Sequence, residues 1–158
     1  MSLAGLGLLL ALALVACGGS DDVDLRAGET VFEAPTFRVV VPAGWTATLD
    51  DDPSALDQVN LREDGAPGQR AQAMISRFRI DTTPPAGGRL GEPHGDVDGE
   101  QAWIVGGSYG RPPDTHRTAN VRVDRGGSRY DVFFEAPTPR FEDRRPALER
   151  ILETLRFG

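Results

Sequence analysis

The residues His116 to Glu135 read HRTANVRVDRGGSRYDVFFE, and this stretch decides the fold of the chain. Gly126-Gly127 separates two runs in which apolar and polar residues alternate, which is the pattern of a β-hairpin with a two-residue turn. The turn predicts three apolar pairs on one face, namely Val123 with Tyr130, Val121 with Val132, and Ala119 with Phe134. On the other face it places Arg122 opposite Asp131. A shift of one residue would destroy both sets of pairs, so we expect this register in the structure.

Upstream of this hairpin the pattern predicts further strands. They are expected at 37–41, 59–61, 70–80, 93–97 and 100–105, with Gly44-Trp45 as a turn into 46–49 and Asp98-Gly99 as the turn of a second hairpin. Asp52-Pro53 is expected to begin a short helical turn, and 81–92, which is rich in Pro and Gly, is expected to be a loop. The run from Ala102 to Val105 is apolar on both faces, which is typical of a central strand covered by other layers.

The C-terminal stretch predicts one amphipathic helix from about Asp143 to Phe157. Its apolar stripe consists of Leu148, Ile151, Leu152 and Leu155, at the spacing i, i+3, i+4 and i+7. Pro146 is expected in the first turn, where its missing N–H has no cost, and Arg145 can pair with Glu149. Together these elements predict an α+β fold, mainly an antiparallel β-sheet with a C-terminal amphipathic helix, as a single domain over 29–158.

The N-terminal residues resemble a bacterial lipoprotein signal. The run from Leu3 to Val15 is apolar but shorter than a membrane span, and it ends in Leu14-Val15-Ala16-Cys17. We expect 1–16 to be a signal peptide, Cys17 to be acylated with palmitate-type chains, and 17–28 to be a flexible tether. The protein would then lie on the outer face of the cytoplasmic membrane. The alternative is an ordinary signal peptide with a chance cysteine near the cleavage site.

Composition excludes several classes of protein. The net charge is −7, which disfavours nucleic acid as a partner. The chain contains one cysteine, so no disulfide framework can form. All 17 basic residues are arginine, a bias that suggests a GC-rich genome such as that of an actinobacterium.

Two motifs could carry chemistry. Gly106-Gly107-Ser108-Tyr109-Gly110 matches the G-x-S-x-G pattern of a hydrolase nucleophile, with Asp114 and His116 as its only compact partners. The alternative is a strand-end turn that is rich in small residues. His94, Asp96 and Asp98 alternate and could bind a divalent cation weakly, although the hairpin turn explains the segment without a metal.

The remaining polar and aromatic candidates have simpler explanations. Asp50-Asp51-Asp52 is expected to be a solvated turn rather than a calcium site. Trp45, Trp103 and Tyr130 are expected in the core rather than on a stacking platform. We therefore expect no catalytic residue, no cofactor and no metal site, and Cys17 is the only modified residue that we assign.

Several segments resemble the PsbP-like superfamily, with the LpqN-type lipoproteins of mycobacteria and their relatives as the nearest members. They are 37–45 (FRVVVPAGW), 130–134 (YDVFF), Ala136-Pro137, Phe141 and 151–157 (ILETLRF). The resemblance implies an antiparallel sheet flanked by helices in an α/β/α sandwich. It also implies an interaction or assembly role, because no catalytic set of the family carries over.

The function that we expect is that of a membrane-tethered, non-enzymatic module that binds or assembles a protein of the cell envelope. Its contact surface is expected at 81–95 and the neighbouring turns around 106–115. Two alternatives remain open from the sequence. One is a carrier of a small apolar or lipid ligand held between sheet and helix, and the other is a small envelope hydrolase that uses Ser108.

Overall fold

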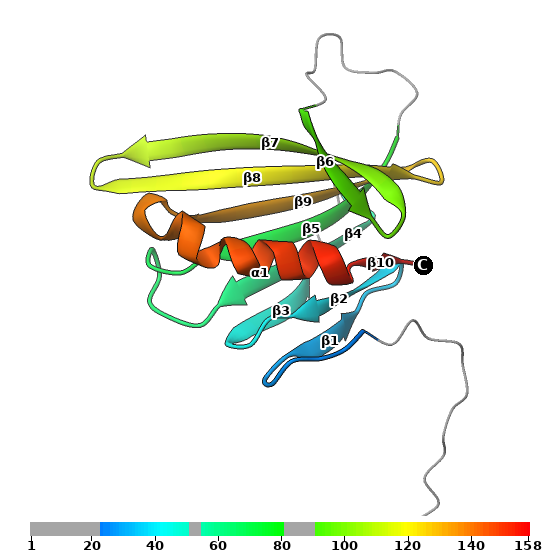
Figure 1. The fold of residues 1–158 in the computed structure, drawn as a ribbon, viewed down its shortest axis with the longest axis horizontal. Helices are drawn as coiled ribbons and strands as arrows, with labels where there is room; N and C mark the ends of the chain where they lie inside the picture. The colour runs from blue at the N-terminus through cyan, green and yellow to red at the C-terminus, as the bar shows by residue number, and fades with distance from the viewer. Residues whose placement is uncertain (1–22, 51–54, 81–90) are drawn as a thin grey trace, which may run out of the picture.

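The computed structural model describes residues 23–50, 55–80 and 91–158, and they form two antiparallel sheets and one long helix (Figure 1). The seven-stranded sheet has the order β3-β4-β5-β9-β8-β7-β6, and the three-stranded sheet has the order β1-β2-β10. The strands are β1 (Thr30–Glu33), β2 (Phe37–Val41), β3 (Trp45–Asp50), β4 (Asp57–Glu63), β5 (Gln72–Arg79), β6 (Glu92–Val97), β7 (Glu100–Arg111), β8 (Asp114–Arg125), β9 (Ser128–Pro137) and β10 (Arg156–Phe157). A 3₁₀ turn, Thr138–Arg140, leads into the helix α1 (Phe141–Thr154).

The predicted hairpin is the centre of the large sheet, and its register is confirmed. β8 and β9 pair Val123 with Tyr130, Val121 with Val132, Ala119 with Phe134, and Arg122 with Asp131. The Nε of Arg122 lies 3.0 Å from Oδ1 of Asp131. Gly126 and Gly127 have φ of 56° and 76°, the left-handed conformation that a two-residue turn of this kind requires.

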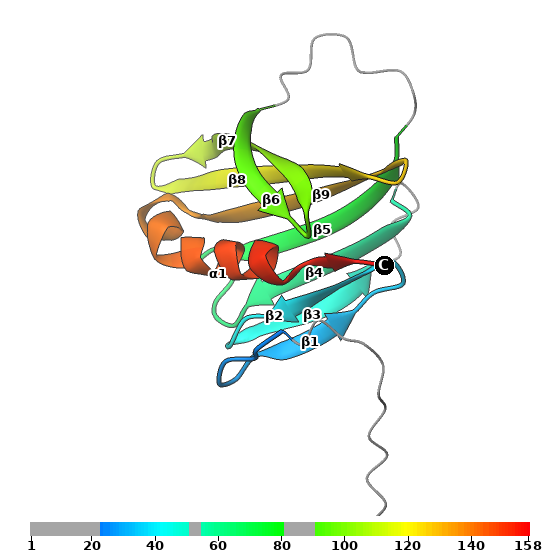
Figure 2. The same ribbon diagram turned by 45° about the vertical axis from the view of Figure 1, so that its right-hand side comes forward.

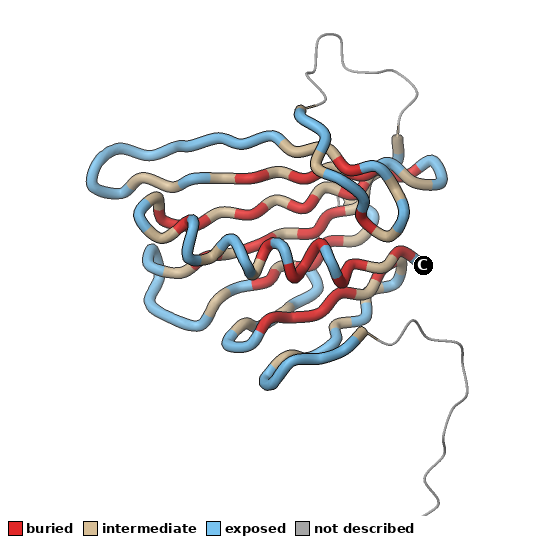
Figure 3. Tube along the Cα trace, viewed as in Figure 1, coloured by how far each residue is buried: buried red, intermediate tan, exposed pale blue. Residues whose placement is uncertain are grey.

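One face of the large sheet is covered by α1 and by the small sheet together (Figures 1 and 2). The ring of Tyr130 on β9 lies 6.3 Å from the ring of Phe37 on β2 and 4.3 Å from that of Phe157 on β10. Phe134 packs against Phe141 at the start of α1, with 5.8 Å between ring centroids. Buried residues therefore follow the inner sides of both sheets and of the helix (Figure 3).

The predicted helix is confirmed in its apolar stripe and corrected at its ends. Leu148, Ile151, Leu152 and Leu155 are all buried, and Arg145 lies 3.1 Å from Glu149. The helix begins two residues earlier than predicted because the 3₁₀ turn leads directly into it, so Pro146 lies inside the helix rather than in its first turn. It ends at Thr154, because Leu155 is extended and β10 pairs with β2.

The prediction of a central, covered strand at 102–105 was wrong. β7 is the second strand from the edge of the sheet, and β6 pairs with it only as far as Ile104. Ala102 is buried, Trp103 and Ile104 are half-buried, and Val105 is 50% exposed. Trp103 is thus not a core residue, whereas Tyr130 is buried and Trp45 packs against the core, as predicted.

The predicted α+β class is confirmed, with a mainly antiparallel sheet and a C-terminal helix. In the described residues, however, helical cover lies on one face only, so the second helical layer of an α/β/α sandwich is not seen there. None of the helices in this part of the chain has the length and apolar character that a membrane crossing needs. We call the uncovered face of the seven-stranded sheet the outer face.

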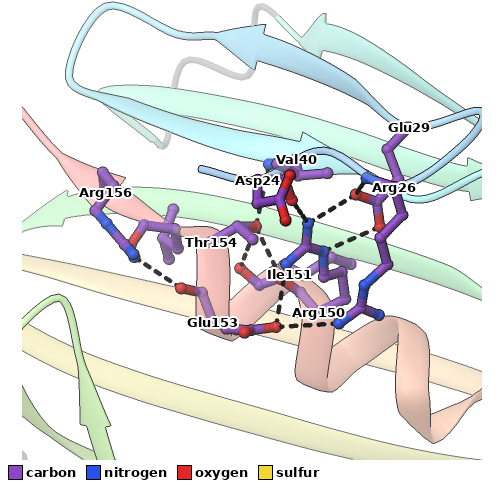
Figure 4. A network of polar contacts seen from close by, with 10 residues as sticks. Asp24, Arg26, Glu29, Val40, Arg150, Ile151, Glu153, Thr154 and Arg156 are labelled. Atoms are coloured by element: carbon purple, nitrogen blue, oxygen red, sulfur yellow. Dashed lines mark hydrogen bonds and ion pairs between the residues drawn. The ribbon is translucent and has the colours of Figure 1, made fainter. Parts of the chain in front are cut away.

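The segment before β1 is fixed to α1 by a buried guanidinium (Figure 4). Arg150 donates to both carboxylate oxygens of Glu29, at 3.0 and 2.7 Å, and to the backbone oxygen of Asp24 at 2.5 Å. The side chains of Arg150 and Glu29 are only 7% and 5% exposed. Residues 23–28, the last part of the predicted tether, therefore include Asp24 and Arg26, which contact α1, and the start of the domain at Glu29 stays a prediction.

Candidate binding surface

The outer face presents the side chains that alternate with those of the core. Its large apolar and aromatic members include Met74 and Phe78 on β5, Trp103, Val105 and Tyr109 on β7, and Phe133 on β9. Met74, Trp103 and Phe133 are half-buried, while Val105 and Tyr109 are each 50% exposed. An open sheet face normally carries polar residues toward water, so this mixture is typical of a surface that binds something.

The middle of the outer face is hollowed. Met74 and Phe133 lie directly opposite each other on β5 and β9, and Asn60 on β4 lies opposite Met74. The hollow holds about 160 Å³ and is lined by Asn60, Leu61, Arg62, Gln72, Ala73, Met74 and Phe133. A lining that combines apolar side chains with amide and guanidinium groups suits an uncharged side chain of a partner.

Asn120 adds an unsatisfied acceptor to the same face. It lies between Val105 on β7 and Phe133 on β9 in the ladder. Its Oδ1 is buried and has no hydrogen-bond partner among the described residues. A buried polar atom without a partner is costly, so this position lowers the stability of the folded domain.

A polar cluster stands at the far end of the outer face. The ring of Tyr109 stacks on His116 with 5.4 Å between centroids, and its hydroxyl donates to Glu135 at 2.5 Å. Gln72 donates to the other oxygen of Glu135. The hydrogen bond to Glu135, followed by burial and by the charge of Glu135, raises the pKa of Tyr109 to about 12. The phenol is therefore a neutral donor at physiological pH, and the cluster orients the ring without activating it.

A larger hollow of about 500 Å³ lies at the opposite end of the domain. Three arginines line it, Arg38, Arg125 and Arg156. Asp98 occupies their centre, because it accepts from Arg125 at 2.8 Å and from the backbone N–H of Phe157 at 2.9 Å. These contacts join the β6–β7 turn to β10, which gives this cluster a structural role.

The geometry around Ser108 does not support a nucleophile. The G-x-S-x-G segment is neither a strand-to-helix turn nor a strand-end turn, because β7 continues through it to Arg111. Ser108 pairs with Arg117, whereas His116 pairs with Tyr109 and Asp114 with Arg111. Since neighbouring residues of a strand point to opposite faces, Ser108 faces away from both His116 and Asp114. Arg117 is itself held by Glu142, at 2.6 Å.

The acidic candidates are engaged in other contacts. The ladder between β6 and β7 shifts register between Pro93 and Gly95, so simple alternation does not continue from His94 to Asp98. Asp50 accepts from Gln58 and Asn60, at 3.2 and 2.9 Å. In the residues that the structure describes, no group of three His, Cys, Asp or Glu side chains is arranged to hold a metal ion.

Three sequence predictions lie outside the described residues. They are the acylated Cys17 with its signal peptide, the helical turn at Asp52-Pro53, and most of the loop at 81–92. Of the predicted contact surface, residues 92–95 belong to β6, and 106–115 is not a set of turns but the long hairpin of β7 and β8. The outer face itself was not predicted. The sequence did contain a signal for it, because Val132 and Phe133 are neighbours in one strand and their side chains must point to opposite faces of the sheet.

Fold and surface together define a class: an α+β domain with an antiparallel sheet that α1 and a small sheet cover on one side. Comparison with solved structures identifies proteins that have a similar fold. LpqN of Mycobacterium tuberculosis, a protein involved in cell envelope biogenesis, matches with a TM-score of 0.57 at 19% identity, over 82% of this chain and 90% of that chain. A protein of Bacteroides thetaiotaomicron matches with a TM-score of 0.57 at 11% identity, over 83% of this chain and 49% of that chain. The chain thus spans about half the length of that second neighbour.

The cyanobacterial PsbP of Synechocystis also matches, with a TM-score of 0.45 at 12% identity, over 89% of this chain and 98% of that chain. No family model matches the chain, and neither does any curated protein. At these identities the likeness to LpqN shows a shared fold. The predicted similarity to the LpqN-type proteins is therefore confirmed for the fold, and membership of that family stays a prediction.

Proposed function

We propose that this chain is a lipid-anchored, extracytoplasmic module that binds a protein of the cell envelope through its outer face. The observation that carries the proposal is the composition of that face, where Met74, Phe133 and Trp103 lie on the same side of the sheet as polar groups such as Asn120. Aromatic, Met and Arg side chains are enriched at protein interfaces, and this face combines Met74, Phe133 and Trp103 with arginines such as Arg122. The shared fold with LpqN, a protein involved in cell envelope biogenesis, supports this assignment.

The anchor belongs to the same proposal. Acylation of Cys17 would hold the domain at the membrane surface through a short tether, because two or more acyl chains give stable anchoring. Growth of the host with labelled palmitate should label the wild-type chain but not a Cys17→Ala variant. An unlabelled wild-type chain would contradict the anchor while leaving the binding surface to be tested separately.

The two alternative functions have less support. A carrier needs a space between sheet and helix, but that space is filled by Phe134, Ile75 and Ile151, each fully buried. None of the three hollows of about 160, 230 and 500 Å³ is lined by both α1 and the seven-stranded sheet. A hydrolase needs a base beside Ser108, and His116 lies on the opposite face of the hairpin.

Site-specific photo-crosslinking in the host membrane tests the binding surface. A photoreactive residue at Met74 should give a discrete adduct with an envelope protein. The matched control is the same residue at Glu149, which is exposed on α1 on the opposite side of the domain. A Phe133→Asp substitution should abolish the adduct, because it places a charge in the centre of the interface. Equal adducts from both positions, or none from Met74, would contradict the proposal.

A further inference from the structure

The three-stranded sheet carries apolar side chains on the face that points away from the core. In β2, Phe37, Val39 and Val41 belong to the core cluster, so Val40 between them points to the opposite face. Val31 lies directly opposite Val40 in the ladder between β1 and β2, and it therefore shares that face. The small sheet thus has an apolar pair on the side that the large sheet does not cover.

This pair borders a hollow of about 230 Å³, which we call the β1–β2 hollow. Val40 is buried there, at 1% exposure, whereas Leu25 and Val31 are 45% and 44% exposed. Two half-exposed aliphatic side chains beside one hollow form a continuous apolar surface, which is a feature of contact sites. The lining residues are Val23, Leu25, Val31, Glu33, Arg38, Val39, Val40 and Thr154.

The β1–β2 hollow lies where the chain leads to the proposed anchor. Val23, the first described residue, lines the hollow, and Cys17 precedes it by six residues. A polypeptide spans at most about 3.6 Å per residue, so the Cα atoms of Cys17 and Val23 are no more than about 22 Å apart in any conformation. Acyl chains on Cys17 therefore keep a lipid surface within reach of the hollow, at a high local concentration.

We propose that the domain docks on the membrane through the β1–β2 hollow, with Leu25 and Val31 in contact with lipid at the membrane surface. This inference rests on the proposed anchor at Cys17. The hollow and the outer face lie on opposite sides of the domain, because the small sheet packs on the inner side of the large one (Figure 2). The outer face then points away from the membrane and stays open to a partner in the envelope.

The charges around the hollow show what drives the docking. Anionic lipid attracts clusters of basic residues, but acids outnumber arginines here. Docking therefore depends on apolar contact and on the short link to Cys17, and it should not require anionic lipid. The charged residues among the described ones that line the hollow or adjoin a lining residue in sequence are Asp24, Arg26, Glu33, Arg38 and Glu153.

Spin labels on the full acylated chain test this orientation. Val31→Cys provides the only free thiol once acylation has consumed the thiol of Cys17. The matched control is Val105→Cys, a valine of similar exposure on the outer face. In phosphatidylcholine vesicles, the ratio of accessibility to oxygen over accessibility to a water-soluble nickel chelate should be severalfold higher at position 31 than at position 105. A Cys17→Ala chain that carries either label, without vesicles, gives the value of that ratio in water.

A charge at the hollow gives a second test. Leu25→Glu should lower the ratio at position 31 to that at position 105, while the acyl chains keep the protein on the vesicles. The matched control is Leu49→Glu, which changes a leucine that is 51% exposed on β3 and does not line the hollow, and it should leave the ratio unchanged.

Two results would overturn the docking surface alone. One is an equal ratio at positions 31 and 105 in an acylated chain, and the other is a ratio at position 31 that rises only when phosphatidylglycerol is added to the vesicles. A chain whose mass shows no acyl groups would instead contradict the anchor, and this inference with it. Photo-crosslinking from Met74 would still test the outer face, so the failures are distinguishable.

Discussion

At the scale of single residues, the stability of the domain depends on the ion pair between Arg150 and Glu29. Both side chains are almost fully buried. Arg150 also donates hydrogen bonds to Glu153 and to the backbone oxygen of Asp24. A buried charge that loses its partner is not solvated by water. The intact pair therefore contributes little net free energy, whereas removal of one partner destabilises the folded state strongly.

We expect Glu29→Gln to destabilise the protein by about 3 kcal/mol, because it removes the buried counter-charge of Arg150 and leaves it with the exposed Glu153. Urea unfolding of the two proteins measures the difference. The matched control is Glu149→Gln, which removes the partner of Arg145 from an exposed pair of the same helix and should cost less than about 0.5 kcal/mol. Equal effects of the two substitutions would contradict the assigned role.

The same pair predicts how stability depends on pH. The hydrogen bond from Arg150 lowers the pKa of Glu29 from its ordinary value of 4.5, against the opposing effect of burial. A lowered pKa in the folded state means that the stabilisation is complete above about pH 4.5 and is lost as the pH falls through the lowered pKa. The difference in unfolding free energy between wild type and Glu29→Gln should therefore shrink in acid. A difference that stays constant down to pH 2 would contradict this expectation.

At the scale of elements, the β8–β9 turn is the feature that fixes the sheet. Gly126 has φ of 56° and nothing within 4 Å of the position of a Cβ, so any cost of substitution there comes from the backbone alone. We expect Gly126→Val to destabilise by about 1 to 2 kcal/mol, whereas Gly126→Asn should cost clearly less, because Asn adopts this conformation readily. Thermal unfolding of both variants measures the contrast, and similar losses would mean that side-chain crowding, not φ, decides the position.

α1 contains a second element-scale feature, the internal Pro146. It lies in the helix beyond the first turn, so it removes the hydrogen bond that its N–H would give to the carbonyl of Glu142. Pro146→Ala should therefore stabilise the protein by about 2 kcal/mol, a gain that the greater freedom of the unfolded chain reduces. Urea unfolding measures the change. A loss of stability on this exposed position would show that Pro146 is needed to set the start of the helix.

These elements also show what the sequence can predict. The pairs of Val121 with Val132 and of Arg122 with Asp131 were predictable because one short turn fixes both, and the helix stripe was predictable because its period is local. The exposure of Val105 was not, because an apolar run does not reveal how many strands lie beyond it in the sheet. β9 pairs with β5 across a long stretch of chain, and only that pairing brings Met74 beside Phe133 to form the outer face.

At the scale of the whole molecule, the position of the N-terminal segment links the domain to its proposed anchor. Val23 and Leu25 line a hollow of about 230 Å³ with Val39 and Val40 of β2, and Arg26 lies 3.7 Å from Glu153 of α1. The chain therefore enters the domain on the side of the small sheet and α1, whereas the outer face lies on the other side of the large sheet (Figure 2). A partner on the outer face would not compete with residues 23–26 for their contacts.

This arrangement predicts different outcomes for two truncations. A chain that begins at residue 23 keeps every described contact of Arg150 and should unfold at the same urea concentration as the full chain stripped of its acyl groups. A chain that begins at residue 30 loses Glu29 and Asp24 together, so Arg150 is buried with Glu153 as its sole acid partner and the domain should lose at least about 3 kcal/mol. Adding Arg150→Met to the shorter chain should recover much of that loss, because it removes a buried charge that has lost its buried partner but keeps most of the side-chain volume. If the chain from residue 30 is as stable as the chain from residue 23, the segment before β1 is a tether after all, and the domain begins where the sequence alone places it.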